Sequence, residues 1–364
     1  MMTQDTLRIH MTGAEWFGSR AGGLNRYFES LFLALSQRPD VDITAQAFGD
    51  PPAGASQSAA SWGPIGGSTL QRVRASRRVS DLPAGAILDR HFGLYGPPPG
   101  GATLVAHFQG PWAAESALAG DHWIQQKFKY MVERMAYGQV RSFVVLCDEF
   151  RDILRESYGV DDRRINVIPP GVDLTRFQMA AMSSSGTPIV LCVRRLERRM
   201  GIHVLLHAWQ HVSEIHPDAK LVILGTGTEE RALRQMASDL GVDSAVEFAG
   251  RVSDQQLVDY YSRSLFTVVP TIALEGFGLI ALESLASGRA PIVSRCGGLP
   301  DAVSGLDSSL IVEPGDDVAL AERISRALNG AIPSAEACRA HAETFSWDIV
   351  AQRHVELYRR LGQS

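Results

Sequence analysis

Short runs of apolar residues alternate along the chain with segments that have helical periodicity. Apolar runs of about four to eight residues, ended by glycine, proline or polar residues, are typical of buried parallel strands. This pattern occurs at residues 7–13, 41–48, 103–110, 142–148, 165–171, 188–196, 220–227, 246–250, 265–271, 290–298 and 309–316. Amphipathic helices are predicted at residues 24–37, 202–215, 228–240, 254–264 and 346–361. This alternation predicts doubly wound α/β domains.

A break in the pattern predicts a boundary between two such domains. Residues 178–188, QMAAMSSSGTP, are small and polar without periodicity, which is the composition of a linker. A chain of 364 residues also exceeds what one hydrophobic core usually holds. We expect an N-terminal domain over residues 1–178 and a C-terminal domain over residues 186–346, with their strand ends facing across a cleft. Residues 50–69 are expected to form a surface loop.

Composition and charge exclude several classes of protein. Hydrophobic residues make up 45% and charged residues 21%, as in ordinary globular proteins. The formal net charge of -5 argues against a nucleic-acid binder. The four cysteines lack CxxC spacing and the first residues are too polar for a signal peptide, so a cytoplasmic protein with reduced thiols is expected. No apolar run approaches the roughly 20 residues that span a bilayer.

Two glutamates, Glu275 and Glu283, surround a glycine-containing turn between a predicted strand and a predicted helix. Gly276 and Gly278 lie where the helix begins, and glycine lets a backbone approach a ligand closely. The N–H groups at a helix N-terminus attract anions such as phosphate. Carboxylates accept hydrogen bonds from paired hydroxyls of a sugar or ribose. The alternative is a capping acid followed by a solvent-exposed glutamate.

The segment from Ala273 to Val303, ALEGFGLIALESLASGRAPIVSRCGGLPDAV, resembles the E-x7-E signature of retaining glycosyltransferases of family 4, which have the GT-B fold. Other segments agree with that family in the same order, namely residues 21–35, 165–177, 190–209, 221–233, 246–261 and 345–361. The resemblance covers most of the chain and is weakest at residues 50–100. It implies two Rossmann-like domains, the first binding the acceptor and the second the nucleotide sugar. The final helix, at about 347–364, would pack back on the first domain.

The resemblance also implies roles for the matching residues of the second domain. Glu275 would hold hydroxyls of the donor sugar, and Glu283 would bind the ribose. The backbone N–H groups of Phe277, Gly278 and Leu279 would face the sugar and diphosphate. Arg195 would neutralise the leaving diphosphate, and the segment around Arg251 would meet the base.

The chain departs from the family pattern beside Arg195. The family commonly has glycine before this arginine and lysine five residues after it, whereas this chain has Arg194 and Met200. Methionine cannot neutralise a phosphate, but the adjacent Arg199 can bind one in bidentate fashion. We expect Arg195 and Arg199 to share the role. The alternative is that Arg194, Arg198 and Arg199 are surface charges of a loop.

In the first domain, Gly22 and Gly23 open a predicted helix after the first strand, which suits close approach to an anion or sugar. His107 ends a predicted strand, and the resemblance implies that it approaches the transferred sugar as a catalytic residue. The segment 107–116 would line the acceptor side, with Trp112 as a stacking candidate. The alternatives are an ordinary turn and a structural histidine.

A basic segment, QRVRASRR at residues 71–78, could contact anionic lipid headgroups or an acidic, lipid-linked acceptor, although a solvated loop is the alternative. No metal site is expected, because helix ends and arginines can supply the positive charge that the diphosphate needs. The resemblance implies no cofactor, with a nucleoside-diphosphate sugar as co-substrate. UDP is the first candidate nucleotide, and GDP and ADP are alternatives.

These features together predict transfer of a sugar, with retention of configuration, to a glycan or lipid-linked acceptor in polysaccharide, lipopolysaccharide or glycolipid synthesis. We expect a front-face substitution, because no convincing nucleophile is present. A peripheral position on the inner face of a membrane would suit such acceptors. The alternatives are a nucleotide-sugar epimerase, a sugar phosphorylase without an obvious pyridoxal-phosphate lysine, or a catalytically silent GT-B binding or scaffold protein, which Met200 favours. A nicotinamide dehydrogenase is disfavoured, because GTGTEE at residues 225–230 lacks the third glycine of GxGxxG.

Overall fold

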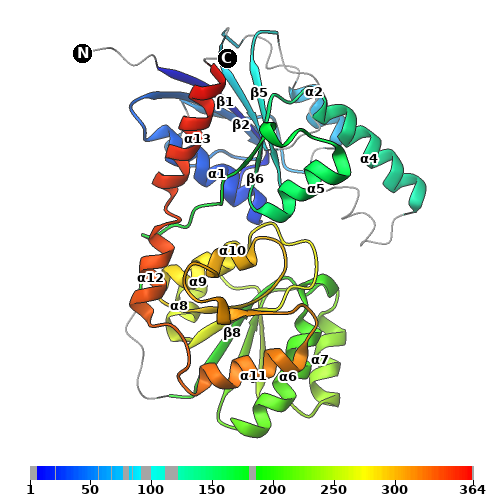
Figure 1. Cartoon of the computed structure of the whole chain (residues 1–364), viewed down its shortest axis with the longest axis vertical. Helices are drawn as coiled ribbons and strands as arrows, with labels where there is room; N and C mark the ends of the chain where they lie inside the picture. The colour runs from blue at the N-terminus through cyan, green and yellow to red at the C-terminus, as the bar shows by residue number, and fades with distance from the viewer. Residues whose placement is uncertain are drawn as a thin grey trace. The chain divides into compact units, whose positions relative to one another are not determined.

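The computed structural model of the chain divides into two compact units, which are described separately (Figure 1). Unit 1 comprises Met1–Gly171 and Trp347–Ser364, and unit 2 comprises Val172–Ser346. The structure describes residues 6–20, 22–55, 57–66, 68–76, 82–83, 85–91, 100–110, 122–179 and 186–362. Within these ranges, no helix combines the length and the apolar character needed to cross a bilayer.

Unit 1 contains a seven-stranded parallel sheet in the order β3-β2-β1-β4-β5-β6-β7. Its strands are β1 (Leu7–Glu15), β2 (Val41–Phe48), β3 (Ala59–Ser61), β4 (Ile87–Arg90), β5 (Thr103–Phe108), β6 (Ser142–Val145) and β7 (Ile165–Val167). Its helices are α1 (Gly23–Ser36), α2 (Thr69–Ser76), α4 (Trp123–Tyr137), α5 (Asp148–Tyr158) and α13 (Trp347–Gly362). The strand order reverses between β1 and β4, which makes this the topological switch point of the sheet.

Unit 2 repeats this arrangement with a six-stranded parallel sheet in the order β10-β9-β8-β11-β12-β13. Its strands are β8 (Ile189–Val193), β9 (Lys220–Leu224), β10 (Val246–Gly250), β11 (Phe266–Val269), β12 (Pro291–Ser294) and β13 (Ile311–Val312). Its helices are α6 (Ile202–Ile215), α7 (Glu230–Asp239), α8 (Asp254–Arg263), α9 (Leu279–Ala286), α10 (Leu299–Val303), α11 (Asp317–Leu328) and α12 (Ala335–Glu343). The switch point lies between β8 and β11. The two parallel sheets confirm the predicted α/β fold.

The central strands are buried because helices cover both faces of each sheet. Figure 1 shows α6, α7 and α11 on one face of the unit 2 sheet and α8, α9 and α12 on the other. Val190, Leu191 and Cys192 of β8 are accordingly all 0% exposed. A strand buried on both faces has a continuous apolar sequence rather than an alternating one. The sequence pattern therefore predicted β8.

Two strands of unit 1 were missed by the sequence analysis. β3 lies inside residues 50–69, which were expected to be a loop, and pairs with β2 through Ala59–Ser61. β4 lies between β1 and β5 and carries two charged residues, Asp89 and Arg90, both of which are buried. Charged side chains in a short strand interrupt the apolar run on which the prediction depended.

Candidate functional site

The loops that follow β8 and β11 meet at the switch point of unit 2. The backbone N–H of Ile272 donates to the carbonyl of Arg199 at 2.9 Å. Gly201 has φ of +73°, and a Cβ there would lie 1.8 Å from the carbonyl oxygen of Pro270. Only glycine permits this approach, so the arginine-rich loop after β8 and the glutamate loop after β11 form one surface.

Arg194 and Glu275 form an ion pair between these two loops. Nη2 of Arg194 donates to Oε2 of Glu275 and to the hydroxyl of Thr271. The side chains are 6% and 13% exposed, respectively. The alternative that Arg194 is a surface charge is therefore wrong. The arginine occupies one oxygen of the carboxylate and fixes its direction.

The turn around Glu275 has a tightly constrained backbone. Leu274 has a φ of +51°. A Cβ at Gly297, whose φ is +56°, would lie 1.6 Å from the carbonyl oxygen of Glu275. Gly278, at φ +79°, precedes α9, and a Cβ there would lie 4.0 Å from the carboxyl carbon of Glu275. The Glu275 side chain therefore lies beside the start of α9.

No side chain of the described residues caps the N-terminus of α9, and free N–H groups at a helix start attract anions. Leu279 is its first residue and is partly exposed. Phe277, two residues earlier, is 2% exposed, and its ring centroid lies 5.9 Å from that of Phe345. Packing of Phe277 thus holds the turn, while its backbone remains part of the helix start.

Glu283 lies one turn into α9 and is 6% exposed. The hydroxyl of Tyr261 donates to its Oε2 at 3.2 Å. The alternative that the second glutamate is solvent-exposed is therefore wrong. Tyr261, which the sequence analysis did not identify, orients this carboxylate from α8.

The basic residues of the loop after β8 occupy different environments. Arg195 is exposed, whereas Nη1 of Arg199 donates to the carbonyl of Leu274 at 2.7 Å. Met200 is 4% exposed and belongs to the core. Arg251 is exposed directly after β10. Arg199 thus holds the backbone of the glutamate loop, whereas Arg195 and Arg198 are exposed.

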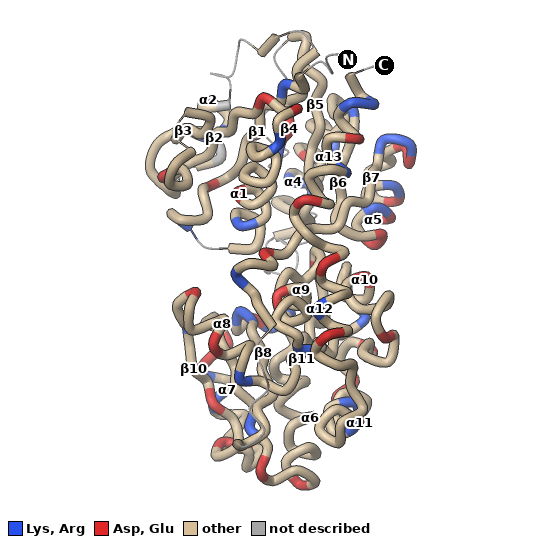
Figure 2. Tube along the Cα trace, turned by 90° about the vertical axis from the view of Figure 1, so that its left-hand side faces the viewer, with Lys and Arg blue, Asp and Glu red and all other residues tan. Residues whose placement is uncertain are grey.

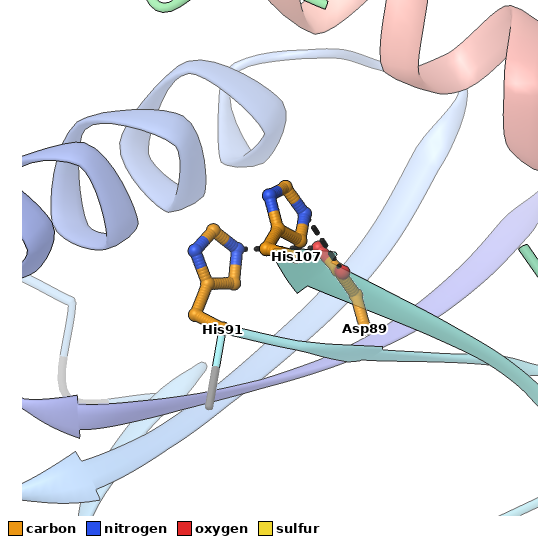
Figure 3. Close-up of side chains that lie close together, drawn as sticks. All are labelled: Asp89, His91 and His107. Carbon is orange, nitrogen blue, oxygen red and sulfur yellow. Dashed lines mark ion pairs between the residues drawn. The ribbon is translucent and has the colours of Figure 1, made fainter. Parts of the chain in front are cut away.

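In unit 1, His107 lies in a buried cluster with Asp89 and His91 (Figure 3). Nε2 of His107 is 3.0 Å from Oδ1 of Asp89, and Nε2 of His91 is 3.4 Å from Oδ2. The hydroxyl of Tyr358, from α13, donates to Oδ2 at 2.8 Å. The rings of His107 and His354 are also stacked, with centroids 5.5 Å apart. The His107 side chain is 0% exposed, so it presents no surface to a substrate in this conformation.

Burial determines the protonation states in this cluster. It lowers the pKa of His107 to about 4 and that of His354 to about 4. Burial opposes the charge on Asp89, but the neighbouring His107 and His91 outweigh it and keep the pKa of this carboxyl well below its usual range. Near neutral pH the cluster therefore contains an ionised Asp89 beside neutral His107 and His354 rings.

Asp89, His91 and His107 are close enough to share a metal ion, since one ligand atom from each lies within 4.8 Å of the others. The two imidazole rings, however, are stacked with centroids 3.8 Å apart and planes inclined by 16°. The lone pairs that bind metals lie in the ring planes, so two nearly parallel rings cannot direct theirs at one ion. The cluster fits a hydrogen-bonded polar core better than a metal centre.

The remaining candidate residues of unit 1 have simpler surroundings. Gly22 precedes α1, and a Cβ there would meet no atom within 4 Å. Gly23 is the first residue of α1, whose N-terminus has no side-chain cap among the described residues. Trp112 lies outside the described residues. Of the basic segment 71–78, Arg72 is bound to Glu15 at 2.7 Å and Arg74 is exposed, while Arg77 and Arg78 are also outside the described residues.

Two family models match the chain. The model described as Glycosyl transferases group 1 matches residues 177–345, and the model described as Glycosyltransferase Family 4 matches residues 21–176. Together they cover the glutamate loop and, except for β1, the strands of both parallel sheets. The chain therefore belongs to glycosyltransferase family 4 and has the GT-B fold, which confirms the resemblance seen in the sequence.

Similar proteins include a D-inositol 3-phosphate glycosyltransferase of Acidothermus cellulolyticus, which is 36% identical over 226 residues, covering 57% of this chain and 50% of that protein. The chain thus spans about half the length of this relative. Sucrose-phosphate synthase from Thermosynechococcus elongatus has a similar structure, with a TM-score of 0.80 and 23% identity over 98% of this chain and 99% of that one. Anabaena HepE in complex with UDP and glucose gives a TM-score of 0.73 at 16% identity, covering 96% and 99% of the two chains. These two structures support the fold.

Proposed function

We propose that this chain is a retaining hexosyltransferase that moves a sugar from a nucleoside diphosphate to an acceptor hydroxyl. The observation that carries the proposal is the arrangement at the switch point of unit 2. There, Glu275 and Glu283 flank the uncapped N-terminus of α9, and Arg195 is exposed on the adjoining loop. Carboxylates for hydroxyls next to an anion site suit a sugar joined to a diphosphate.

The parts of the donor correspond to different groups in this site. Glu283, oriented by Tyr261, accepts hydrogen bonds from the ribose. The N-terminus of α9 at Leu279 and the guanidinium of Arg195 bind the diphosphate, and Arg251 lies near the base. Glu275 binds hydroxyls of the sugar through the oxygen that Arg194 leaves available. UDP is the proposed nucleotide, supported by the UDP-containing HepE complex, with GDP and ADP as alternatives.

The proposed reaction is a front-face substitution at the anomeric carbon. The bond from this carbon to the leaving diphosphate oxygen breaks, and a bond to the acceptor oxygen forms on the same face. The acceptor proton moves to the leaving phosphate oxygen. Catalysis then depends on stabilising the charge of the leaving group by Arg195 and the α9 N-terminus. A trapped glycosyl–enzyme intermediate would contradict this mechanism.

His107 acts indirectly in this proposal, because its side chain is buried. Held by Asp89, it shapes the end of β5 and thereby the start of the segment 107–116, which would line the acceptor side. The acceptor class remains a glycan or a lipid-linked sugar, and Trp112 remains a stacking candidate for it. Gly22 and Gly23 are both exposed and leave the start of α1 accessible to the sugar or phosphate.

A second candidate function is nucleotide-sugar binding without turnover. Two observations favour it: Glu275 is already engaged by Arg194, and the position of the family lysine is a buried methionine, Met200. Both candidates require nucleotide binding, and product formation separates them.

The first experiment is calorimetric titration of the full chain with UDP, GDP and ADP. Replacing Glu283 by alanine should lower the affinity for the preferred nucleotide by roughly 10- to 150-fold, which corresponds to about 1.5–3 kcal/mol for a lost carboxylate contact. Glu283→Gln keeps an acceptor for Tyr261 and tests whether the loss comes from misfolding. Glu322→Ala, an exposed glutamate on α11, is the matched control and should bind normally. Failure of all three nucleotides to bind would contradict both candidates.

A further inference from the structure

Helix α6 contains three of the ten histidines of the chain, spaced four residues apart at His203, His207 and His211. Side chains four positions apart on a helix are neighbours on one face. Two histidines at this spacing can direct ring nitrogens at one metal ion, as in the H-E-x-x-H pattern of helical zinc sites. Val204 stands here where that pattern has the glutamate that acts as a general base. The spacing therefore indicates metal binding without hydrolysis.

Two of these histidines, His203 and His207, line a cavity of about 600 Å³ in unit 2. The helix α11 packs beside α6, as Figure 1 and Figure 2 both show. The other residues that line the cavity are Val204, Ile272, Pro314, Gly315 and Asp317, the last of which is the first residue of α11. The cavity thus brings two imidazoles of one helix together with a carboxylate of another.

The three polar side chains of this cavity are available to a ligand. Within the part of the chain that the structure describes, none of His203, His207 and Asp317 has a hydrogen-bond or ion-pair partner. His203 and Asp317 are partly exposed, and His207 is exposed. The adjacent Asp316 instead caps α11 by accepting from the backbone N–H of Ala319 at 2.8 Å. Capping therefore occupies Asp316 and leaves the carboxylate of Asp317 for another partner.

The electrostatic surroundings of His203 suit a metal ligand. Burial lowers the pKa of His203, and Arg198 and His207 lower it further, which also shows that the two imidazoles are close to each other. The ring of His203 is therefore neutral near pH 7 and offers a lone pair. Glu229 acts on this pKa in the opposite direction. Arg198 opposes a bound cation, whereas Glu229 and Asp317 favour one, so the acids outnumber the base.

This set of side chains differs from the cluster of Asp89, His91 and His107 in unit 1. Among the described residues, only that cluster has three donor atoms within 4.8 Å of one another, but its imidazoles are stacked in the core and cannot turn. The imidazoles of α6 lie on successive turns beside a cavity, so each can rotate about its own side-chain bonds. A shared ion would draw these rings and Asp317 together, and the cost is mainly the loss of rotamer freedom.

We propose that His203, His207 and Asp317 bind a divalent transition-metal ion, with Zn²⁺ as the first candidate, and that this ion joins α6 to α11. Two imidazoles and one carboxylate are a known donor set for zinc, and water completes the tetrahedral coordination. Mg²⁺ and Ca²⁺ prefer oxygen ligands alone and should bind much more weakly. Because the ion binds the folded chain and links two helices, it stabilises unit 2.

The metal site adjoins the proposed donor site but is separate from it. Ile272, which lines the cavity, donates its backbone N–H to the carbonyl of Arg199 and precedes Glu275 by three residues. The diphosphate is assigned to Arg195 and the start of α9, and neither lines this cavity. The ion is therefore not a counter-ion for the diphosphate, and the expectation that the diphosphate needs no metal is unaffected.

The test is calorimetric titration of the full chain, prepared without a histidine tag, with zinc chloride at neutral pH. We expect one ion per chain with a micromolar dissociation constant. His203→Ala, His207→Ala and Asp317→Asn should each lower the affinity about tenfold or more, because even residues that only support a metal ligand contribute about 10- to 100-fold. His207 is exposed, so its replacement should leave the fold intact.

Matched controls come from the same helix and the same unit. His211→Ala removes an exposed histidine that is also four residues from His207 but lies outside the cavity. Asp243→Asn removes an exposed acid of unit 2. Both variants should bind Zn²⁺ as the wild type does. Co²⁺ in place of Zn²⁺ should give the weak visible bands of nitrogen and oxygen ligands, without the intense near-ultraviolet band that a cysteine thiolate would add.

Four outcomes would overturn the proposal. The wild type could fail to bind Zn²⁺, or the double variant His203→Ala/His207→Ala could bind it with unchanged affinity, which would place the ion elsewhere, for example at the cluster of unit 1. Loss of affinity in His211→Ala but not in His203→Ala would assign the ion to the other histidine pair. A thiolate band with Co²⁺ would assign it to cysteine. The titration needs no nucleotide, so its result is independent of the proposed transferase activity.

Discussion

The two units share a strand order, but the polar groups near the switch point are buried in unit 1 and accessible in unit 2. In unit 1, Asp89, His91 and His107 are enclosed among β4, β5 and α13. In unit 2, Arg195 and the start of α9 remain accessible, and Glu275 is held at their side. The same position in one topology is therefore a buried polar cluster in unit 1 and an accessible surface, to which we assign the donor, in unit 2. This contrast makes stability the main readout for unit 1 and binding the main readout for unit 2.

The largest expected effect is a loss of stability of unit 1 on acidification. Burial lowers the pKa of His10, His107 and His354 to about 4, from 6.5 in the unfolded chain. Between these values the unfolded state binds the extra protons, so the stability present above pH 6.5 is lost as the pH falls toward 4. At pH 5 the loss is about 2 kcal/mol for each histidine.

Urea unfolding followed by thiol labelling can measure this loss separately in each unit. Cys147 is buried in unit 1, whereas Cys192, Cys296 and Cys338 are buried in unit 2. Labelling of Cys147 should move to lower urea between pH 7 and pH 5 more than labelling of the others. His10→Gln, which removes one titrating group, should flatten the dependence for unit 1. If the urea concentration at which labelling occurs shifted equally for the cysteines of both units, the buried histidines of unit 1 would not be the cause of the acid sensitivity.

The next effect in size is the loss of the central carboxylate of unit 1. Asp89→Ala leaves the Tyr358 hydroxyl and the His107 imidazole without their acceptor, and each buried donor left unsatisfied costs about 1–3 kcal/mol. Asp89→Asn, which retains an acceptor, should cost less. The matched change in unit 2 is Glu313→Ala, whose partner Arg295 is 57% exposed, and it should cost at most about 1 kcal/mol. A similar loss for both alanine variants would show that the cluster of unit 1 is not structural.

The fold was predictable to different extents in the two units. All six strands of unit 2 were predicted, because buried parallel strands such as β9 are continuous apolar runs. β4 was missed because Asp89 and Arg90 interrupt its pattern, and their burial depends on partners distant in sequence. Tyr358, for example, lies 269 residues from Asp89. A charged residue that is satisfied only by tertiary contacts leaves no local signal.

The same distinction applies to the candidate site. The spacing of Glu275 and Glu283 around the start of α9 is local and could be recognised from the sequence. The partner of Glu275 could not, because Arg194 lies 81 residues away on another loop. The role of Arg199 as a holder of the Leu274 carbonyl is equally non-local. Sequence reasoning thus identified the turn proposed to bind the donor and missed the side chains that position it.

The smallest expected effect concerns this positioning by Arg194. Arg194→Met keeps most of the side-chain volume but removes the charge that fixes the Glu275 carboxylate. Since Glu275 is assigned to the sugar and Glu283 to the ribose, affinity for a UDP-sugar should fall about tenfold while affinity for UDP changes little. Calorimetric titration of UDP and UDP-glucose against wild type and variant measures both.

Arg194→Lys provides the control for this last prediction, because it keeps the charge with fewer donors. It should lose less UDP-glucose affinity than Arg194→Met. If the affinities for UDP and UDP-glucose fall equally, Arg194 supports the fold of the loop rather than the direction of Glu275. The buried polar groups of the two units would then have more similar, structural roles. If UDP-glucose instead binds more tightly, the arginine competes with the sugar for the carboxylate, and binding without turnover becomes the better account of this chain.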